Sequence, residues 1–214
     1  TGLLVFDTTE GEFSYYDGSN WILLKAIPLA LSDSDGDTKI EVEEMPDEDV
    51  IHFEVGGTEY GRMVGGRLEP VNTGNGICIG ALSGQCLNGV NNFNTFVGNF
   101  AGRNNSSGSY NTFLGGAAGK DNTTGEYNVF VGYNAGANNI TGAQNLAIGM
   151  SSGENNESGS GNTTIGYRSG VFNTASNNSF YGNFSGVVNT TGHSNAFFGK
   201  DAGRANTTAH RNAF

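Results

Sequence analysis

A short pattern recurs along the chain from residue 76 onward, and this repeat restricts the fold more than any other feature. The pattern reads Asn, any residue, an aromatic residue, an aliphatic residue and Gly, and it closes with Ala or Ser followed by Gly. One copy runs from Asn94 to Gly102, and the next runs from Asn111 to Gly119. The first glycine of each copy stands at positions 80, 98, 115, 132, 149, 166, 182 and 199. The repeat therefore has a period of about 17 residues.

A unit of this length is too short for the helical hairpin repeats, which need 33 residues or more. Its core favours a β-strand, and glycines stand at both corners. The connectors between copies are rich in turn residues, such as Asn-Asn-Ser-Ser-Gly at 104–108 and Asp-Asn-Thr-Thr-Gly at 121–125. We therefore predict an all-β fold, a parallel β-solenoid with one repeat in each coil. Asparagines at equivalent positions of successive coils are expected to hydrogen-bond along the solenoid axis.

Two adjacent positions of the repeat are both apolar, although neighbouring side chains of a strand point to opposite faces. We label the first position the inner column and the next the outer column, although the pattern does not decide which of them faces the interior of the coil. Most members of the inner column are aromatic, namely Phe96, Phe113, Phe130, Phe180 and Phe197. The next position, the outer column, is mostly aliphatic and includes Val97, Leu114, Val131, Ile148 and Ile165. Cys78 replaces Phe in the inner column, which favours a small buried thiol.

Two opposed apolar columns leave two alternatives open. In the first, one column fills the interior of the coil and a neighbouring identical chain covers the other, because a long apolar stripe left in water exceeds what monomers usually expose. In the second, a flattened monomeric solenoid is wide enough to bury both columns. The first alternative predicts a homo-oligomeric fibre whose interface and core residues are the members of these two columns.

The unit Asn-Thr-Phe-Val-Gly-x-x-Ala-Gly, with its Asn-Thr-Thr-Gly connector, resembles the head repeats of YadA-like bacterial trimeric adhesins and related phage-type tail-fibre proteins. The resemblance covers roughly residues 76–214. It implies a left-handed parallel β-roll, three chains packed side by side, and an adhesive or structural role instead of catalysis. The sequence departs from the adhesin heads in its longer period and in its aromatic column, where smaller residues are usual.

Charge divides the chain into two predicted domains. Residues 1–70 hold 16 of the 21 Asp and Glu residues and 4 of the 10 Lys and Arg residues. We expect this part to be an acidic, β-rich connector with short strands over 2–6, 12–16 and 21–24, and residues 71–214 to form the solenoid. Phosphate binding needs clustered basic residues, so the acidic part argues against nucleic acid or an anionic membrane as partner. No apolar run approaches the length of a membrane span.

An acidic turn in the first domain is the best candidate for site chemistry. Asp33, Asp35 and Asp37 occupy positions 1, 3 and 5 of a loop similar to an EF-hand, and Glu44 stands at position 12. Calcium takes 6–8 oxygen ligands, which these carboxylates would supply in part. However, Gly36 is at position 4 of the loop instead of position 6, and residues 40–42 look like a strand. The alternatives are therefore a Ca²⁺ site and a solvated acidic turn.

The sequence predicts a structural or adhesive segment of an extracellular fibre or cell-surface appendage, or of a phage-like particle. Its expected partners are copies of itself, with a trimer favoured, and a glycan or protein on another surface. This interpretation requires no cofactor, and we expect no enzymatic activity. The alternative is a tail-spike protein that binds or cleaves glycans, since such enzymes use paired carboxylates. The five carboxylates of the repeat region form no evident pair in the sequence: Asp121, Glu126, Glu154, Glu157 and Asp201.

Overall fold

The computed structural model describes residues 4–7, 12–16, 19, 21–24, 30–32, 38–42, 50–55, 58–64, 67–70, 76–84 and 93–213. The chain divides into two compact units, Thr1–Val71 and Asn72–Phe214. All regular secondary structure in the described ranges is β-strand. The prediction of an all-β fold is therefore confirmed.

The first unit contains two antiparallel sheets. One has the order β1-β2-β3, from Leu4–Asp7, Glu12–Tyr16 and Trp21–Leu24. The other has the order β4-β5-β6-β7-β8, from Ala30–Ser32, Lys39–Val42, Val50–Val55, Thr58–Val64 and Arg67–Pro70. The predicted strands over 12–16 and 21–24 agree with β2 and β3, whereas β1 begins and ends later than the predicted strand over 2–6.

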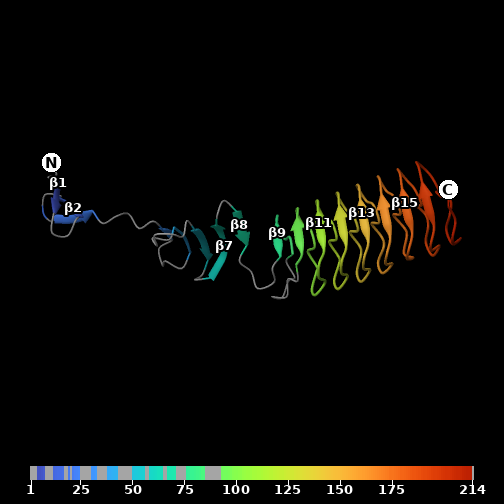
Figure 1. Ribbon diagram of the computed structural model, residues 1–214, viewed down its shortest axis with the longest axis horizontal. Coiled ribbons are helices and arrows are strands. Elements are labelled where there is room, and N and C mark those ends of the chain that lie inside the picture. The colour runs from blue at the N-terminus through green and yellow to red at the C-terminus, as the bar shows by residue number, and fades with distance from the viewer. Residues whose placement is uncertain are drawn as a thin grey trace. The chain divides into compact units, whose positions relative to one another are not determined.

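The second unit is a parallel β-solenoid. Its eight strands have three residues each and pair in sequence order, with every strand parallel to the next (Figure 1). They are β9 Ile77–Ile79, β10 Thr95–Val97, β11 Thr112–Leu114, β12 Val129–Val131, β13 Leu146–Ile148, β14 Thr163–Ile165, β15 Ser179–Tyr181 and β16 Ala196–Phe198. Because the pairing is in register, each repeat position forms a column along the axis; Phe96, for example, pairs with Phe113 and Phe113 with Phe130. The predicted solenoid with one repeat in each coil is confirmed.

Left-handed backbone conformations bend each coil back on itself. Gly98, directly after β10, has φ 134°, and an added Cβ there would lie 2.5 Å from the carbonyl oxygen of Gly115. Gly102 has φ 56°, and its Cβ would lie 2.6 Å from the ring of Phe96. These two glycines of the repeat therefore allow the coils to stack closely and the aromatic ring to fill the coil. Residues other than glycine also adopt left-handed backbone conformations in each coil, as Tyr110 (φ 57°) and Ala117 (φ 55°) do.

The inner column forms the core of the solenoid. Phe96, Phe113 and Phe130 are at most 1% exposed, and their rings stack with centroids 4.9 Å apart. Phe180 and Phe197 stack in the same way at 5.0 Å. Between these two stacks the column contains the smaller Ala147 and Thr164, both of which are also buried. The aromatic position of the repeat is thus the dry interior of a single chain.

Cys78 differs from the other members of the inner column. The sequence predicts a buried thiol, but Cys78 is exposed, so this prediction is wrong. The reason is its place in the sheet: β9 is an edge strand, and only β10 pairs with it.

Two columns of asparagine complete the interior. In the first ladder, at the start of each strand, the backbone N–H of one asparagine donates to the side-chain oxygen of the previous one, as from Asn111 to Asn94 at 2.8 Å. In the second ladder, in the connectors, the side-chain amide of Asn122 donates to Asn105 at 2.7 Å and that of Asn139 donates to Asn122 at 2.7 Å. Buried polar groups need such partners to avoid the cost of lost hydration. The predicted asparagine hydrogen bonds along the axis are confirmed.

Candidate functional site

The outer column lies on the outside of the strands. Leu114 is 47% exposed and Ile148 is 37% exposed, although both are apolar. Val97, Val131 and Ile165 are half-buried. A single coil therefore buries the inner column and leaves the outer column in contact with solvent, so the flattened coil that would bury both is not observed.

We define the strand face as the first and third residues of β9 to β16, whose side chains point outward. None of the residues in these eight strands is charged. Large apolar side chains extend the face beyond the strands, and several are exposed, including Tyr133, Met150 and Tyr167. On its other side Tyr110 stacks against both Phe93 and Tyr127. The strand face is thus an uncharged and largely apolar surface that repeats once per coil, and the columns of Tyr133 and Tyr110 that flank it end in the charged residues Lys200 and Arg211.

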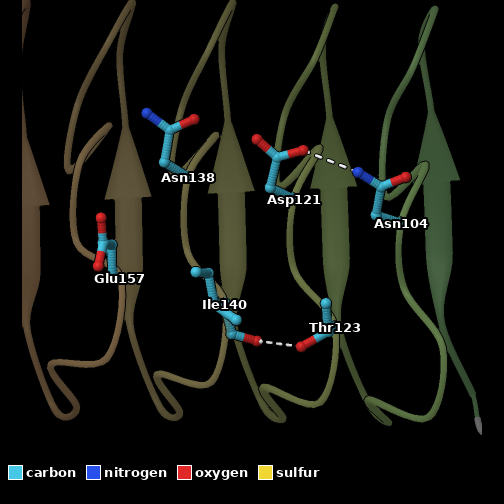
Figure 2. Close-up of a pocket in the computed structure, with 6 residues that line it drawn as sticks. All are labelled: Asn104, Asp121, Thr123, Asn138, Ile140 and Glu157. Carbon is cyan, nitrogen blue, oxygen red and sulfur yellow. Dashed lines mark hydrogen bonds between the residues drawn. The ribbon is translucent and has the colours of Figure 1, made fainter.

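A second candidate site is a groove of about 400 Å³ on the segments that follow the strands. Its six lining residues form two rows along the axis (Figure 2). One row contains Asn104, Asp121 and Asn138, and the other contains Thr123, Ile140 and Glu157. We call this the connector groove; none of its residues belongs to a strand.

Three polar side chains of the connector groove each donate a hydrogen bond within the solenoid. The amide of Asn104 donates to a carboxylate oxygen of Asp121 at 2.8 Å, and the hydroxyl of Thr123 donates to the carbonyl oxygen of Ile140 at 3.0 Å (Figure 2). The amide of Asn138 donates to Asn155 at 2.6 Å, so its oxygen is turned toward Asp121. Lys120 forms a salt bridge of 3.2 Å with the other oxygen of Asp121.

Three residues of the connector groove depart from the repeat. In the coils from residue 94 to residue 161, the position of Asp121 is otherwise occupied by Asn. The position of Ile140 and Glu157 is occupied by Ser or Thr in the other coils after residue 94. These departures are far apart in the sequence, and the solenoid brings all three to one groove.

The second asparagine ladder is interrupted beside the connector groove. The side-chain oxygen of Asn139 is buried without a hydrogen-bond partner. The amide of Asn156, one coil further, donates to the carbonyl of Gly159 at 2.9 Å, as those of Asn122 and Asn139 do within their own turns, but its oxygen also accepts from the N–H of Gly159 at 2.8 Å. The coil that carries Glu157 therefore differs from the others in its hydrogen bonds as well as in its sequence.

The candidate calcium ligands Asp33, Asp35, Asp37 and Glu44 all lie outside the described residues. The prediction of a Ca²⁺ site at this turn therefore stays a prediction. Elsewhere, within the part of the chain that the structure covers, no group of three or more His, Cys, Asp or Glu residues is arranged to hold a metal ion.

Spacing along the chain did not indicate that Asp121 and Glu157 share a groove, because the five carboxylates of the repeat form no evident pair in the sequence. The structure places both in the connector groove, two coils apart. A signal for this was present in the sequence, since each residue replaces a neutral polar residue of its column. Comparing the repeats position by position would have singled out both carboxylates.

Comparison of this chain with protein-family models, with curated proteins and with solved structures found no match. None of the described segments forms a helix of the length and apolarity that crossing a bilayer requires. Its function is therefore argued from the strand face and the connector groove themselves.

Proposed function

We propose that this chain is a structural and adhesive segment of a homo-oligomeric extracellular fibre, with three chains favoured. The observation that carries the proposal is the uncharged strand face. Side chains such as Leu114, Ile148 and Phe198 remain 47%, 37% and 60% exposed in the single chain. Full burial of an exposed large apolar side chain contributes roughly 1.5–3 kcal/mol, so burial of the part of these side chains that remains exposed would contribute about half as much for each.

A second copy of this chain is the partner that best fits the strand face. The face repeats with the spacing of the coils, and an identical solenoid has the same spacing. Two such faces therefore place apolar side chains opposite each other coil after coil, with no charged strand residue to desolvate. An obligate interface of this kind is more apolar than an ordinary protein surface.

The adhesive part of the proposal rests on the repeated connectors. Exposed hydroxyl side chains recur there in successive coils, as at Thr124, Thr141 and Thr191. Weak contacts that are repeated on one rigid body add up to strong attachment when several are made at once. We propose a glycan or protein on another cell or surface as the receptor, and a cell-surface appendage or a phage-like particle as the location of the fibre.

The experiment that tests the proposal is the molar mass of the chain in solution, measured by light scattering. We expect about 67 kDa, which is three times the 22.3 kDa of one chain. In the Ile148→Glu variant a charge is placed on the strand face, and the mass is expected to fall to that of a monomer. The matched control is Thr124→Glu, which adds the same charge to an exposed connector residue and should leave the mass unchanged.

Circular dichroism of both variants checks that the solenoid remains folded. A mass of 22.3 kDa for the unmodified chain at all concentrations would contradict the proposal. A stable mass of two or four chains would keep the oligomeric fibre and replace the trimer.

A further inference from the structure

We propose that the connector groove binds a saccharide chain that carries free amino groups. This inference deepens the proposed adhesive function and rests on it, because it names the class of receptor that one part of the fibre recognises. It starts from the six lining residues and from the hydrogen bonds that they already make.

The connector groove offers mainly hydrogen-bond acceptors to a ligand. Asn104, Thr123 and Asn138 each donate a hydrogen bond to another residue of the solenoid. The carboxylate of Asp121 and the side-chain oxygen of Asn138 face each other along one row, and both retain lone pairs. Asn104 and Asn138 each keep a second amide N–H, so a ligand that both donates and accepts hydrogen bonds, as a sugar hydroxyl group does, fits this row.

The charge of the connector groove selects among hydroxyl-bearing ligands. Asp121 is neutralised by Lys120 at 3.2 Å. Glu157 is exposed, and among the described residues its carboxylate has no ion pair or hydrogen bond. An ammonium group on the ligand would pair with Glu157, whereas the carboxylate of an acidic sugar would be repelled by it.

One apolar side chain lies in the same groove. Ile140 is 40% exposed and stands between Thr123 and Glu157 in the second row (Figure 2). It offers a surface for the C–H groups of a sugar ring, beside the acceptors that bind the ring's hydroxyl groups. Ile140 and Glu157 replace the Ser or Thr of the other coils, and Asp121 replaces the Asn of its neighbouring coils, so the repeat changes at the residues that form this mixed surface.

The repeat itself supplies variants that should fold. Asp121→Asn and Glu157→Thr restore residues that other coils carry at these positions. Asn at 121 would extend the row of amides from Asn104 to Asn138. Glu126→Ser is the matched control, because it removes a carboxylate outside the groove and introduces the residue found at the same position in three other coils, Ser109, Ser160 and Ser176.

The test is isothermal titration calorimetry of the whole chain with a glucosamine tetramer. We expect saturable binding that weakens at least tenfold in Glu157→Thr, weakens severalfold in Asp121→Asn and is unchanged in Glu126→Ser. The N-acetylglucosamine tetramer should bind more weakly because it lacks the ammonium groups. A galacturonic acid trimer should not bind.

Several outcomes would overturn the inference. One is the absence of binding of the glucosamine tetramer at millimolar concentration, and another is equal binding by Glu157→Thr. Spermine that binds as tightly as the tetramer would show recognition of ammonium groups alone. If calcium chloride binds in the groove and the tetramer does not, the oxygen atoms of the groove form a cation site instead of a sugar site.

Light scattering of the same samples separates this inference from the proposed fibre. If sugar does not bind while the oligomer remains intact, only the proposed sugar site in the connector groove is contradicted. A monomeric mass with sugar binding intact contradicts only the fibre.

Discussion

The inner and outer columns of the solenoid strands are both mostly apolar in sequence, yet they have different surroundings. Phe113 in β11 is fully buried, while the next residue, Leu114, is 47% exposed. A sheet with one side in water usually alternates apolar residues with polar ones. Here the coil closes around the inner column alone, so the apolar character of the outer column does not serve the folding of one chain. The comparison separates residues that hold a coil together from residues that are available to join coils of different chains.

The largest expected effect comes from truncating the inner column. Phe113→Ala removes a ring that stacks on Phe96 and Phe130 at 4.9 Å, and the surrounding backbone cannot collapse into the space. We expect the free energy of unfolding to fall by about 3–5 kcal/mol. Denaturant unfolding monitored by circular dichroism measures this change.

Leu114→Ala is the control for this prediction, because it truncates the neighbouring residue of the same strand on the outer column. In a sample dilute enough to be monomeric, it should change the stability by no more than about 0.5 kcal/mol. An equal loss of unfolding free energy in the two variants would contradict the distinction between the columns, since the outer column would then contribute to the core of one chain.

The asparagine ladders give the next largest effect. Asn128 accepts a hydrogen bond from the backbone N–H of Asn145 at 2.9 Å and donates one to the carbonyl of Gly142 at 2.8 Å. Asn128→Leu leaves the buried N–H of Asn145 without this partner, and such a loss costs about 1–3 kcal/mol. The melting temperature should fall accordingly, and amide hydrogen exchange at Asn145 should accelerate.

Asn99→Leu serves as the control for the ladder variant, because Asn99 is an exposed asparagine of the solenoid that belongs to neither ladder. A ladder variant as stable as this control would show that the inner column alone determines the stability of the coils. A larger loss of stability in Asn128→Leu would instead show that the aromatic column and the asparagine ladders both stabilise the solenoid.

The sequence was sufficient to predict the coil, its period and the alignment of equivalent positions, because each repeat carries its own glycines and asparagines. It was not sufficient to decide which apolar column faces inward. That choice depends on where the coil bends, and residues such as Tyr110 and Ala117 adopt left-handed conformations that their types do not predict. In the folded chain the aromatic column faces inward and the flattened coil that would bury both columns is not observed, while coverage of the outer column by a neighbouring chain stays a prediction.

The connector groove was harder to predict than the fold. Asp121 and Glu157 are two coils apart and occupy different positions of the repeat, so neither spacing nor a motif links them. Their proximity follows from the stacking of the coils, which short-range patterns do not encode. The acidic turn around Asp33 shows the opposite case, since its spacing suggests a ligand set while its structure lies outside the described residues.

The smallest expected effect concerns the part of the inner column that is not aromatic. Thr164 is buried, and its side-chain oxygen lies 2.9 Å from the hydroxyl of Ser152, which also bonds the carbonyl of Thr164 at 2.7 Å. Thr164→Val keeps the shape of the side chain and removes one of these two contacts. Because the hydroxyl of Ser152 keeps its bond to the carbonyl, we expect a loss of only about 0.5–1.5 kcal/mol, measured by denaturant unfolding. Thr112→Val, on the exposed side of β11, should be close to neutral. If Thr164→Val instead stabilised the chain, the inner column would tolerate a fully apolar filling at this coil, and the hydroxyl pair would have a role other than stability.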